Sequence, residues 1–300
     1  MAMNEDLERL IKRVEQLLAR FEATLPQAQS APDWKKGLAY RWRKRGYAGF
    51  LQLVAHPHKI RLTDLQGIGD QIRLIEQNTR QFMEGLTANN VLLTGARGTG
   101  KSSLVKALLN KFSSKGLRLI EVDKQDLIDL PDIVDLVADV PFKFILFCDD
   151  LSFDADEPGY KALKVILDGS ISAASENLLI YATSNRRHLM PEFMQENLQT
   201  KYLGEEIHPG ESVEEKISLS ERFGLWVSFY PFDQEEYLTI VNYWLGVLGV
   251  PERDRGGEAR NEALQWALTR GSRSGRVAWH FARDWAGRHG IMSESPRKKS

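Results

Sequence analysis

The stretch 91–109, VLLTGARGTGKSSLVKALL, constrains the fold of this chain more than any other. A short apolar run passes through a glycine-rich turn into apolar residues at helical spacing, so the stretch predicts a strand, a tight loop and a helix. Gly95, Gly100, Lys101 and Ser102 fit the pattern G-x-x-x-x-G-K-[ST]. In a strand–loop–helix context this pattern is specific for a loop that holds the phosphates of a nucleotide.

The residue types of this loop follow from the charge of a triphosphate. Several backbone N–H groups must converge on the anion, and glycine permits this because it tolerates positive φ and close ligand approach. The following helix directs its free N–H groups and the positive end of its dipole at the same anion. We therefore expect Lys101 to bridge the β- and γ-phosphates of ATP and Ser102 to ligate Mg²⁺. The predicted nucleotide-binding residues are Gly95, Ala96, Arg97, Gly98, Thr99, Gly100, Lys101, Ser102 and Ser103.

Composition narrows the class of protein. The 300 residues are 42% hydrophobic and 27% charged, as in an ordinary globular protein with a sizeable core. A formal net charge of -1 gives no global field that attracts nucleic acid or membrane. The single cysteine suits a reducing compartment, and no apolar run approaches the ~20 residues of a membrane span. With no signal peptide evident at the N-terminus, we expect a cytoplasmic protein that does not contact a membrane.

Further strands are expected at 117–122, 144–148, 178–183 and 225–229, with helical segments between them, and everything after residue 231 is helical in pattern. Strands that alternate with helices predict an α/β fold, here a five-stranded parallel sheet flanked by helices. A closing run of helices predicts a separate subdomain. We expect an N-terminal helical and basic-aromatic extension over 1–59 and an α/β nucleotide-binding subdomain over 60–231. A helical lid subdomain over 232–290 and a disordered tail over 291–300 would follow.

The N-terminal extension carries two distinct features. Apolar residues spaced by four and three predict a helix over 7–25, widened by two further leucines, which favours docking onto a domain but leaves self-association open. In 34–61, arginines and lysines interleave with tryptophan and tyrosine. Such a segment could hold a nucleic-acid backbone and stack bases, or it could be a solvated basic face anchored by its aromatics. The second interpretation is favoured because the cluster is local.

Two carboxylates directly follow the apolar strand 144–148. Residues at the carboxyl end of a parallel strand lie at the sheet edge where ligands bind in α/β folds. We expect Asp149 to hold Mg²⁺ through water and Asp150 to orient or deprotonate the attacking water. Asp154 and Asp156 are expected to be surface loop residues.

The order of these motifs resembles that of an AAA+ ATPase. The order is the phosphate loop, FILFCDD, LLIYATSN, LSERF and then helices with GSRSGR. The resemblance implies that Asn185 is the sensor 1 residue, which positions the attacking water. It also implies that Arg222 reaches the γ-phosphate of a neighbouring subunit. Arg276 matches the lid arginine called sensor 2, with Arg273 as an alternative.

Two narrower resemblances bear on function. The run from AYRWRKRGY to SGRVAWHFARDW is similar to a bacterial family of predicted AAA+-type ATP-binding proteins with an undefined cellular role. The bacterial replication initiator is similar around the acidic strand and the RFG after Glu221, which keeps a nucleic-acid role open. Many AAA+ proteins have glutamate where this chain has Asp150, so a slow, switch-like ATPase is also open.

We therefore expect a Mg²⁺-dependent AAA+ protein that binds ATP, hydrolyses it to ADP and phosphate, and assembles into a homo-oligomeric ring. Hydrolysis would remodel or load a macromolecular partner that the sequence does not identify. The alternative is a nucleotide-gated switch that binds nucleic acid, with slow or incidental hydrolysis. A small-molecule kinase is a weaker alternative, because it would need neither Asn185 nor a subunit-bridging arginine.

Overall fold

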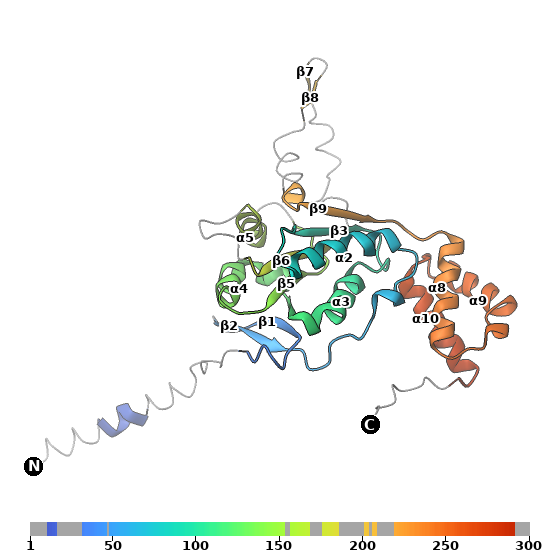
Figure 1. Cartoon of the computed structure of the whole chain (residues 1–300), viewed down its shortest axis with the longest axis horizontal. Coiled ribbons are helices and arrows are strands. Elements are labelled where there is room, and N and C mark those ends of the chain that lie inside the picture. Colours follow the sequence, from blue (N-terminus) through green and yellow to red (C-terminus); the bar gives the residue numbers. More distant parts are fainter. Residues whose placement is uncertain are drawn as a thin grey trace, which may run out of the picture.

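A central seven-stranded sheet organises the chain (Figure 1). The computed structural model describes residues 11–16, 32–46, 48–153, 157–168, 176–185, 201–203, 206–208 and 219–291. The strand order is β2-β1-β4-β5-β6-β3-β9.

All five predicted strands are present and run parallel to one another. They are β3 (Val91–Gly95), β4 (Leu117–Glu121), β5 (Lys143–Cys148), β6 (Leu178–Ser184) and β9 (Leu225–Phe229). Almost every residue of β3 to β6 is buried, as expected for parallel strands covered on both faces. Because β3 lies between β6 and β9, the loop after β3 opens beside the carboxyl end of β6.

The prediction of five strands was wrong, because a hairpin from the expected extension joins the sheet. Strand β1 (Ala39–Arg45) pairs parallel to β4, and β2 (Ala48–Leu53) pairs antiparallel to β1. In β1, Tyr40 and Trp42 are 2% and 4% exposed and alternate with charged residues that are not buried. This period of two is typical of a half-buried strand. Residues 39–45 and 48–53 therefore belong to the sheet, and the other predicted domain limits stay predictions.

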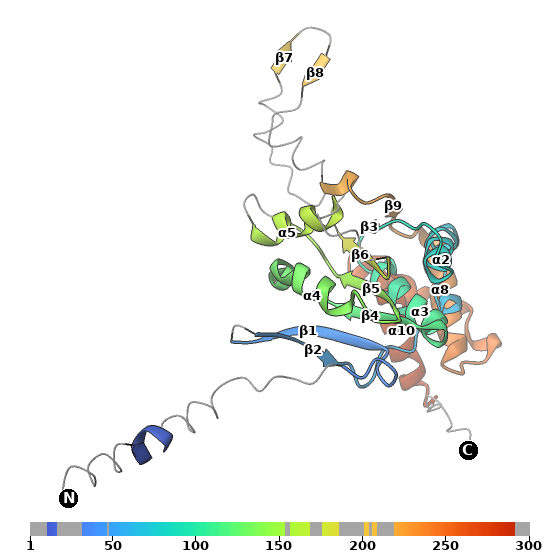
Figure 2. The same cartoon turned by 60° about the vertical axis from the view of Figure 1, so that its left-hand side comes forward.

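Helices cover both faces of the sheet (Figure 2). Helices α2 (Gly69–Met83) and α3 (Lys101–Phe112) lie on one side, and α4 (Leu130–Val137) and α5 (Pro158–Leu167) on the other. Alternate residues of each strand face the two layers: Val91 and Leu93 belong to the first core, Leu92 to the second. The part of the chain that contains β1 to β9 is therefore a three-layer α/β structure.

The C-terminal region is helical, as predicted. It contains α8 (Gln234–Val247), α9 (Gly257–Thr269) and α10 (Gly275–Arg288), drawn in orange and red in Figure 1. Asp233 and Glu236 form a reciprocal capping box at the start of α8. The Tyr243 hydroxyl of α8 donates to Asp64 Oδ1 at 2.6 Å, which ties this region to the 3₁₀ helix η1 (Leu62–Asp64) ahead of α2.

The remaining elements are short. They are three 3₁₀ helices, η2 (Ser113–Lys115), η3 (Lys124–Asp129) and η4 (Glu252–Asp254), and an antiparallel pair formed by β7 (Lys201–Leu203) and β8 (Glu206–His208). In the part of the chain given above, every helix is too short or too polar to span a lipid bilayer.

The predicted N-terminal helix is described only over residues 11–16, which are helical. Ile11 and Val14 of its apolar stripe are 50% and 47% exposed. The rest of the stripe lies outside the described residues, as do Asp154, Asp156 and the tail 292–300. Docking and self-association of this helix both stay open.

Candidate functional site

The loop between β3 and α3 needs glycine for its backbone path. Gly95, Gly98 and Gly100 have φ of 121°, 75° and 104°, in the left-handed region that other residues rarely adopt. A Cβ on Gly95 would lie 1.9 Å from the carbonyl oxygen of Phe229, so β9 leaves no room for a side chain. The Ala96 N–H donates to that same carbonyl at 3.1 Å, which fixes the start of the loop against β9.

Lys101, the first residue of α3, points its ammonium group into this loop. It is 6% exposed, and its Nζ donates to the carbonyls of Gly95 at 2.7 Å and Ala96 at 2.8 Å. It also donates to Asn185 Oδ1 at 3.1 Å. Burial lowers the pKa of Lys101 to about 8, against the opposing effect of the Asp149 and Asp150 charges. A bound polyphosphate would favour the charged form, so the loop and its lysine fit such an anion.

The two expected magnesium ligands are in direct contact. The Ser102 hydroxyl donates to Asp149 Oδ1 at 2.6 Å, so the start of α3 meets the carboxyl end of β5. One hydroxyl and one carboxylate are the oxygen donors that suit Mg²⁺, which usually keeps waters and substrate phosphates as its other ligands. Within the described residues, no three His, Cys, Asp or Glu side chains are grouped so as to hold a metal ion.

Asp150 and Asn185 lie beside this pair. The Asn185 amide donates to Asp150 Oδ1, and Arg97 Nη2 lies 3.7 Å from Asp150 Oδ2. Together with Ser152, these three residues line a cavity of about 330 Å³. Asn185 therefore links Lys101 to Asp150, and residues predicted from three separate motifs form one polar network.

Sequence reasoning missed Thr183, the central residue of this network. Its hydroxyl donates to Asp149 Oδ1 at 2.6 Å and accepts the backbone N–H of Asp150 at 2.8 Å. The signal was a hydroxyl residue near the carboxyl end of β6, next to the strand that ends in two aspartates. Strand order alone makes those two ends neighbours.

The N-terminus of α10 rests on the phosphate loop. The Gly275 N–H donates to the Gly98 carbonyl at 2.9 Å, and Ser274 caps the helix by accepting the N–H of Val277. A Cβ on Gly98 would lie 2.8 Å from Ser274 Oγ and 3.5 Å from Arg276 Cβ. Arg276 therefore lies beside the loop, and the choice between Arg276 and Arg273 as the lid arginine stays a prediction.

Arg222, which precedes β9, is engaged by an acidic residue. Its Nε donates to Asp168 at the end of α5. Asp168 is therefore one ion-pair partner of Arg222 among the described residues. Its action on a neighbouring subunit stays a prediction.

A family comparison matches most of the chain. The sequence profile described as "Protein of unknown function (DUF815)" matches residues 35–289. The chain belongs to this family. No curated protein matches it.

Solved structures of RuvB from Thermotoga maritima, an AAA+ ATPase, share the fold of this DUF815 chain. A threonine-to-valine variant gives a TM-score of 0.51 at 15% identity, over 78% of this chain and 69% of that chain. A proline-to-glycine variant gives a TM-score of 0.50 at 15% identity, over 77% of this chain and 68% of that chain. An alanine-to-serine variant gives a TM-score of 0.50 at 14% identity, over 77% of this chain and 67% of that chain. This chain therefore shares the fold of these structures, and identity this low establishes the fold alone.

Three basic residues of the DUF815 hairpin form ion pairs within the chain. Arg41 lies 2.6 Å from Glu121, and Arg43 lies 2.8 Å from Asp123. Further along β1, Lys44 lies 2.9 Å from Asp129, which also accepts the Trp42 indole N–H. The carboxylates of β4 and η3 thus neutralise much of this cluster, which favours the interpretation of 34–61 as a packed segment.

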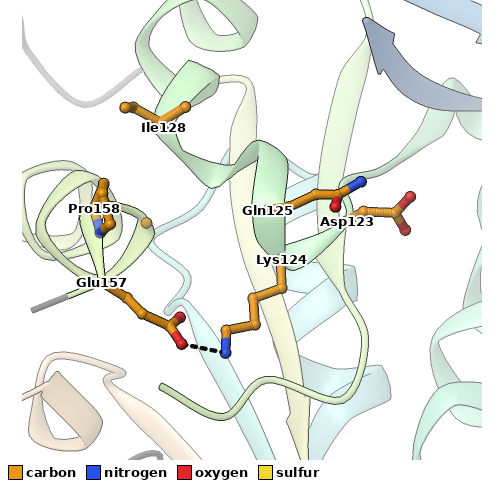
Figure 3. A pocket seen from close by; sticks show the side chains of 7 residues that line it. Asp123, Lys124, Gln125, Ile128, Glu157 and Pro158 are labelled. Atoms are coloured by element: carbon orange, nitrogen blue, oxygen red, sulfur yellow. Dashed lines mark hydrogen bonds and ion pairs between the residues drawn. The ribbon is translucent and has the colours of Figure 1, made fainter. Parts of the chain in front are cut away.

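A second, larger cavity lies apart from the predicted site residues (Figure 3). It has a volume of about 730 Å³ between η3 and the start of α5, and Lys124 Nζ lies 2.7 Å from Glu157 at its wall. Its lining consists of Asp123, Lys124, Gln125, Ile128, Glu157, Pro158 and Gly159. None of the residues predicted for nucleotide binding or catalysis lines it, so cavity size does not identify the chemical site here.

Proposed function

We propose that this protein binds ATP with Mg²⁺ and hydrolyses it to ADP and phosphate. One observation carries the proposal: Lys101, Asn185 and Asp150 form a continuous hydrogen-bonded chain beside the Ser102–Asp149 pair. A cation, a magnesium-type oxygen pair and a second carboxylate at one edge of the sheet are the parts that phosphoryl transfer to water requires. The AAA+ fold supports the same reading.

Each residue has a role that follows from its position. The loop N–H groups and Lys101 would hold the β- and γ-phosphates, while Ser102 and Asp149 would hold the metal ion. When bound, Mg²⁺ neutralises charge on the phosphate oxygens. Asp150 would accept the proton of the attacking water, and Asn185 would fix that carboxylate and the water. Arg276, beside Gly98, would add positive charge from the lid.

The proposal includes assembly into a homo-oligomeric ring. Arg222 would leave Asp168 and reach the γ-phosphate held by a neighbouring subunit, which would make turnover depend on assembly. Such an ATPase converts hydrolysis into movement, so the proposed cellular task is to remodel or load a macromolecular partner.

One observation favours a second candidate, a nucleotide-gated switch with slow hydrolysis. Asp150 Oδ1 accepts from Asn185 and Oδ2 faces Arg97, so both oxygens are engaged. A carboxylate held in this way, and one methylene shorter than glutamate, is a poor base for water. In this second candidate ATP would lock the oligomer on nucleic acid.

Turnover measurements on the full chain test both candidates. Phosphate release is measured with Mg²⁺ and ATP, alone and with single-stranded DNA, duplex DNA or RNA, against Asp150→Asn as the matched inactive control. Release that the control lacks supports an ATPase. Mg²⁺-ATP binding without release, together with ATP-dependent nucleic-acid binding, supports the switch. Absence of ATP binding overturns both candidates. If ATP does bind, a pull-down with Asp150→Asn and ATP serves to identify the partner.

A further inference from the structure

Thr183 stands between the two carboxylates of the site. It is the penultimate residue of β6 and is 2% exposed. Its hydroxyl donates to Asp149 Oδ1 at 2.6 Å and accepts the N–H of Asp150 at 2.8 Å. Its carbonyl accepts the N–H of Leu151 at 2.7 Å. One buried residue therefore holds three consecutive residues of the acidic turn.

That turn has an unfavourable backbone conformation. Asp150 has φ of 54°, and among the described residues it is the only one other than glycine with positive φ. A side-chain-bearing residue persists in this region only where its surroundings fix it. The two N–H groups that follow Asp149 are both bound by Thr183, so the conformation is set from β6.

We propose that Thr183 is a positioning residue for hydrolysis. Its hydroxyl turns Asp149 toward Ser102 and, through the Asp150 backbone, directs the next carboxylate toward Asn185. The inference rests on the proposed ATPase function and adds a residue to it. None of the hydrogen bonds of Thr183 described above reaches the phosphate loop or α10. Its effect on hydrolysis therefore passes through the two aspartates.

The proposal depends on the hydroxyl and not on the size of the side chain. A hydroxyl gives one hydrogen bond and accepts others, which is what the Asp149 carboxylate and the Asp150 N–H require. Valine has nearly the same shape but can do neither, and it leaves a buried N–H without its partner. Serine keeps the hydroxyl and loses only a methyl group.

The test compares Thr183→Val with Thr183→Ser in the full chain. We expect valine to lower kcat roughly 10- to 100-fold, because small displacements of catalytic groups have effects of that order. The Mg²⁺ concentration for half-maximal turnover should rise, and the ATP dissociation constant should change less than about twofold, since the loop contacts are intact. Serine should restore both kcat and the Mg²⁺ midpoint to within about threefold of wild type.

A matched control separates positioning from folding. Thr79 of α2 is also fully buried, and its hydroxyl also joins two groups, the Ile75 carbonyl and the Tyr181 hydroxyl. Thr79→Val should lower thermal stability and leave the Mg²⁺ midpoint unchanged. If circular dichroism shows that Thr183→Val does not fold, Thr183→Ala replaces it under the same criteria.

Two results would overturn the inference. One is Thr183→Val with wild-type kcat and Mg²⁺ midpoint. The other is Thr183→Ser that is as impaired as valine. A wild-type chain that never releases phosphate would instead refute the proposed ATPase, and this inference with it, so the two failures are distinguishable.

Discussion

The backbone N–H of Gly275 donates a hydrogen bond to the carbonyl of Gly98 at 2.9 Å, so the start of α10 and the loop after β3 meet through main-chain atoms. Because neither residue has a side chain, the two backbones approach closely, and a Cβ on Gly275 would lie 3.2 Å from that carbonyl oxygen. If nucleotide binding changes the conformation of this loop, as the proposed function implies, the hydrogen bond would pass that change to α10.

Lys101→Ala should weaken ATP binding at least roughly tenfold, or about 1.4 kcal/mol. The substitution deletes a charge-assisted contact to phosphate inside a buried loop. Titration calorimetry measures the dissociation constant, with Lys106→Ala, later in α3, as the control. Equal affinities for Lys101→Ala and wild type would show that the loop does not hold the phosphates.

ATP binding near pH 8 should take up about half a proton per subunit, because burial lowers the pKa of Lys101 to about 8 and a bound anion raises it again. Affinity should fall as the pH rises above 8. The folding stability of the nucleotide-free protein depends on pH in the opposite direction from ATP affinity. Between pH 8 and the ordinary pKa of 10.5, the unfolded chain holds more protons on this lysine, so its contribution to stability rises with pH.

Calorimetry at pH 8 in buffers of different ionisation enthalpy measures that proton uptake. Lys101→Met should remove the uptake, and Lys106→Met should retain it. Identical apparent enthalpies in all buffers for the wild-type chain would contradict a titrating lysine at the site.

Asp150→Asn should retain ATP affinity within about threefold and reduce turnover at least about 100-fold, because the shape stays while the base is lost. Phosphate release and nucleotide binding are measured on the same preparation. Surviving turnover would move the role to another carboxylate. Glu121 and Asp123 are then poor substitutes, since Arg41 and Arg43 already pair with them, and Asp154 lies outside the described residues.

Arg222→Ala should leave ATP affinity nearly unchanged and reduce turnover roughly 10³-fold or more, the effect known for arginine fingers. Turnover per wild-type subunit should rise with protein concentration. Mixing Arg222→Ala with Lys101→Ala should restore some activity, since one subunit binds ATP and its neighbour still offers Arg222. Two variants that stay inactive when light scattering shows mixed oligomers would assign Arg222 a structural role with Asp168.

Local spacing made the phosphate loop predictable from sequence. Glycines with positive φ, a lysine and a serine at fixed separations need no information from the rest of the chain. The meeting of Asp149 with Ser102 was also predictable, because parallel strands bring their carboxyl ends to one edge of a sheet. The five parallel strands were expected from short, largely apolar runs separated by helical segments.

Other features depend on partners that are distant in sequence. Strand β1 was not predicted, because its many basic residues are unusual in a half-buried strand. In the structure, Glu121 and Asp123 neutralise Arg41 and Arg43, and the aromatic neighbours of these arginines fill the core. A threonine in an apolar strand gives no indication of which atoms its hydroxyl meets, so Thr183 was missed. The pairing of Arg222 with Asp168 likewise needs the three-dimensional placement of α5.

Two hydrogen bonds and a shared apolar core join the C-terminal helices to the rest of the protein. Tyr243 of α8 is bound to Asp64, and Gly275 of α10 is bound to Gly98. If both hydrogen bonds persist while the helices move as one body, the movement left to them is a rotation about the line that joins the two bonds. A shift of the loop after β3 would then displace α9, which makes neither of these bonds. A distance between labels on α9 and α4 that does not change with ATP would rule out this rotation.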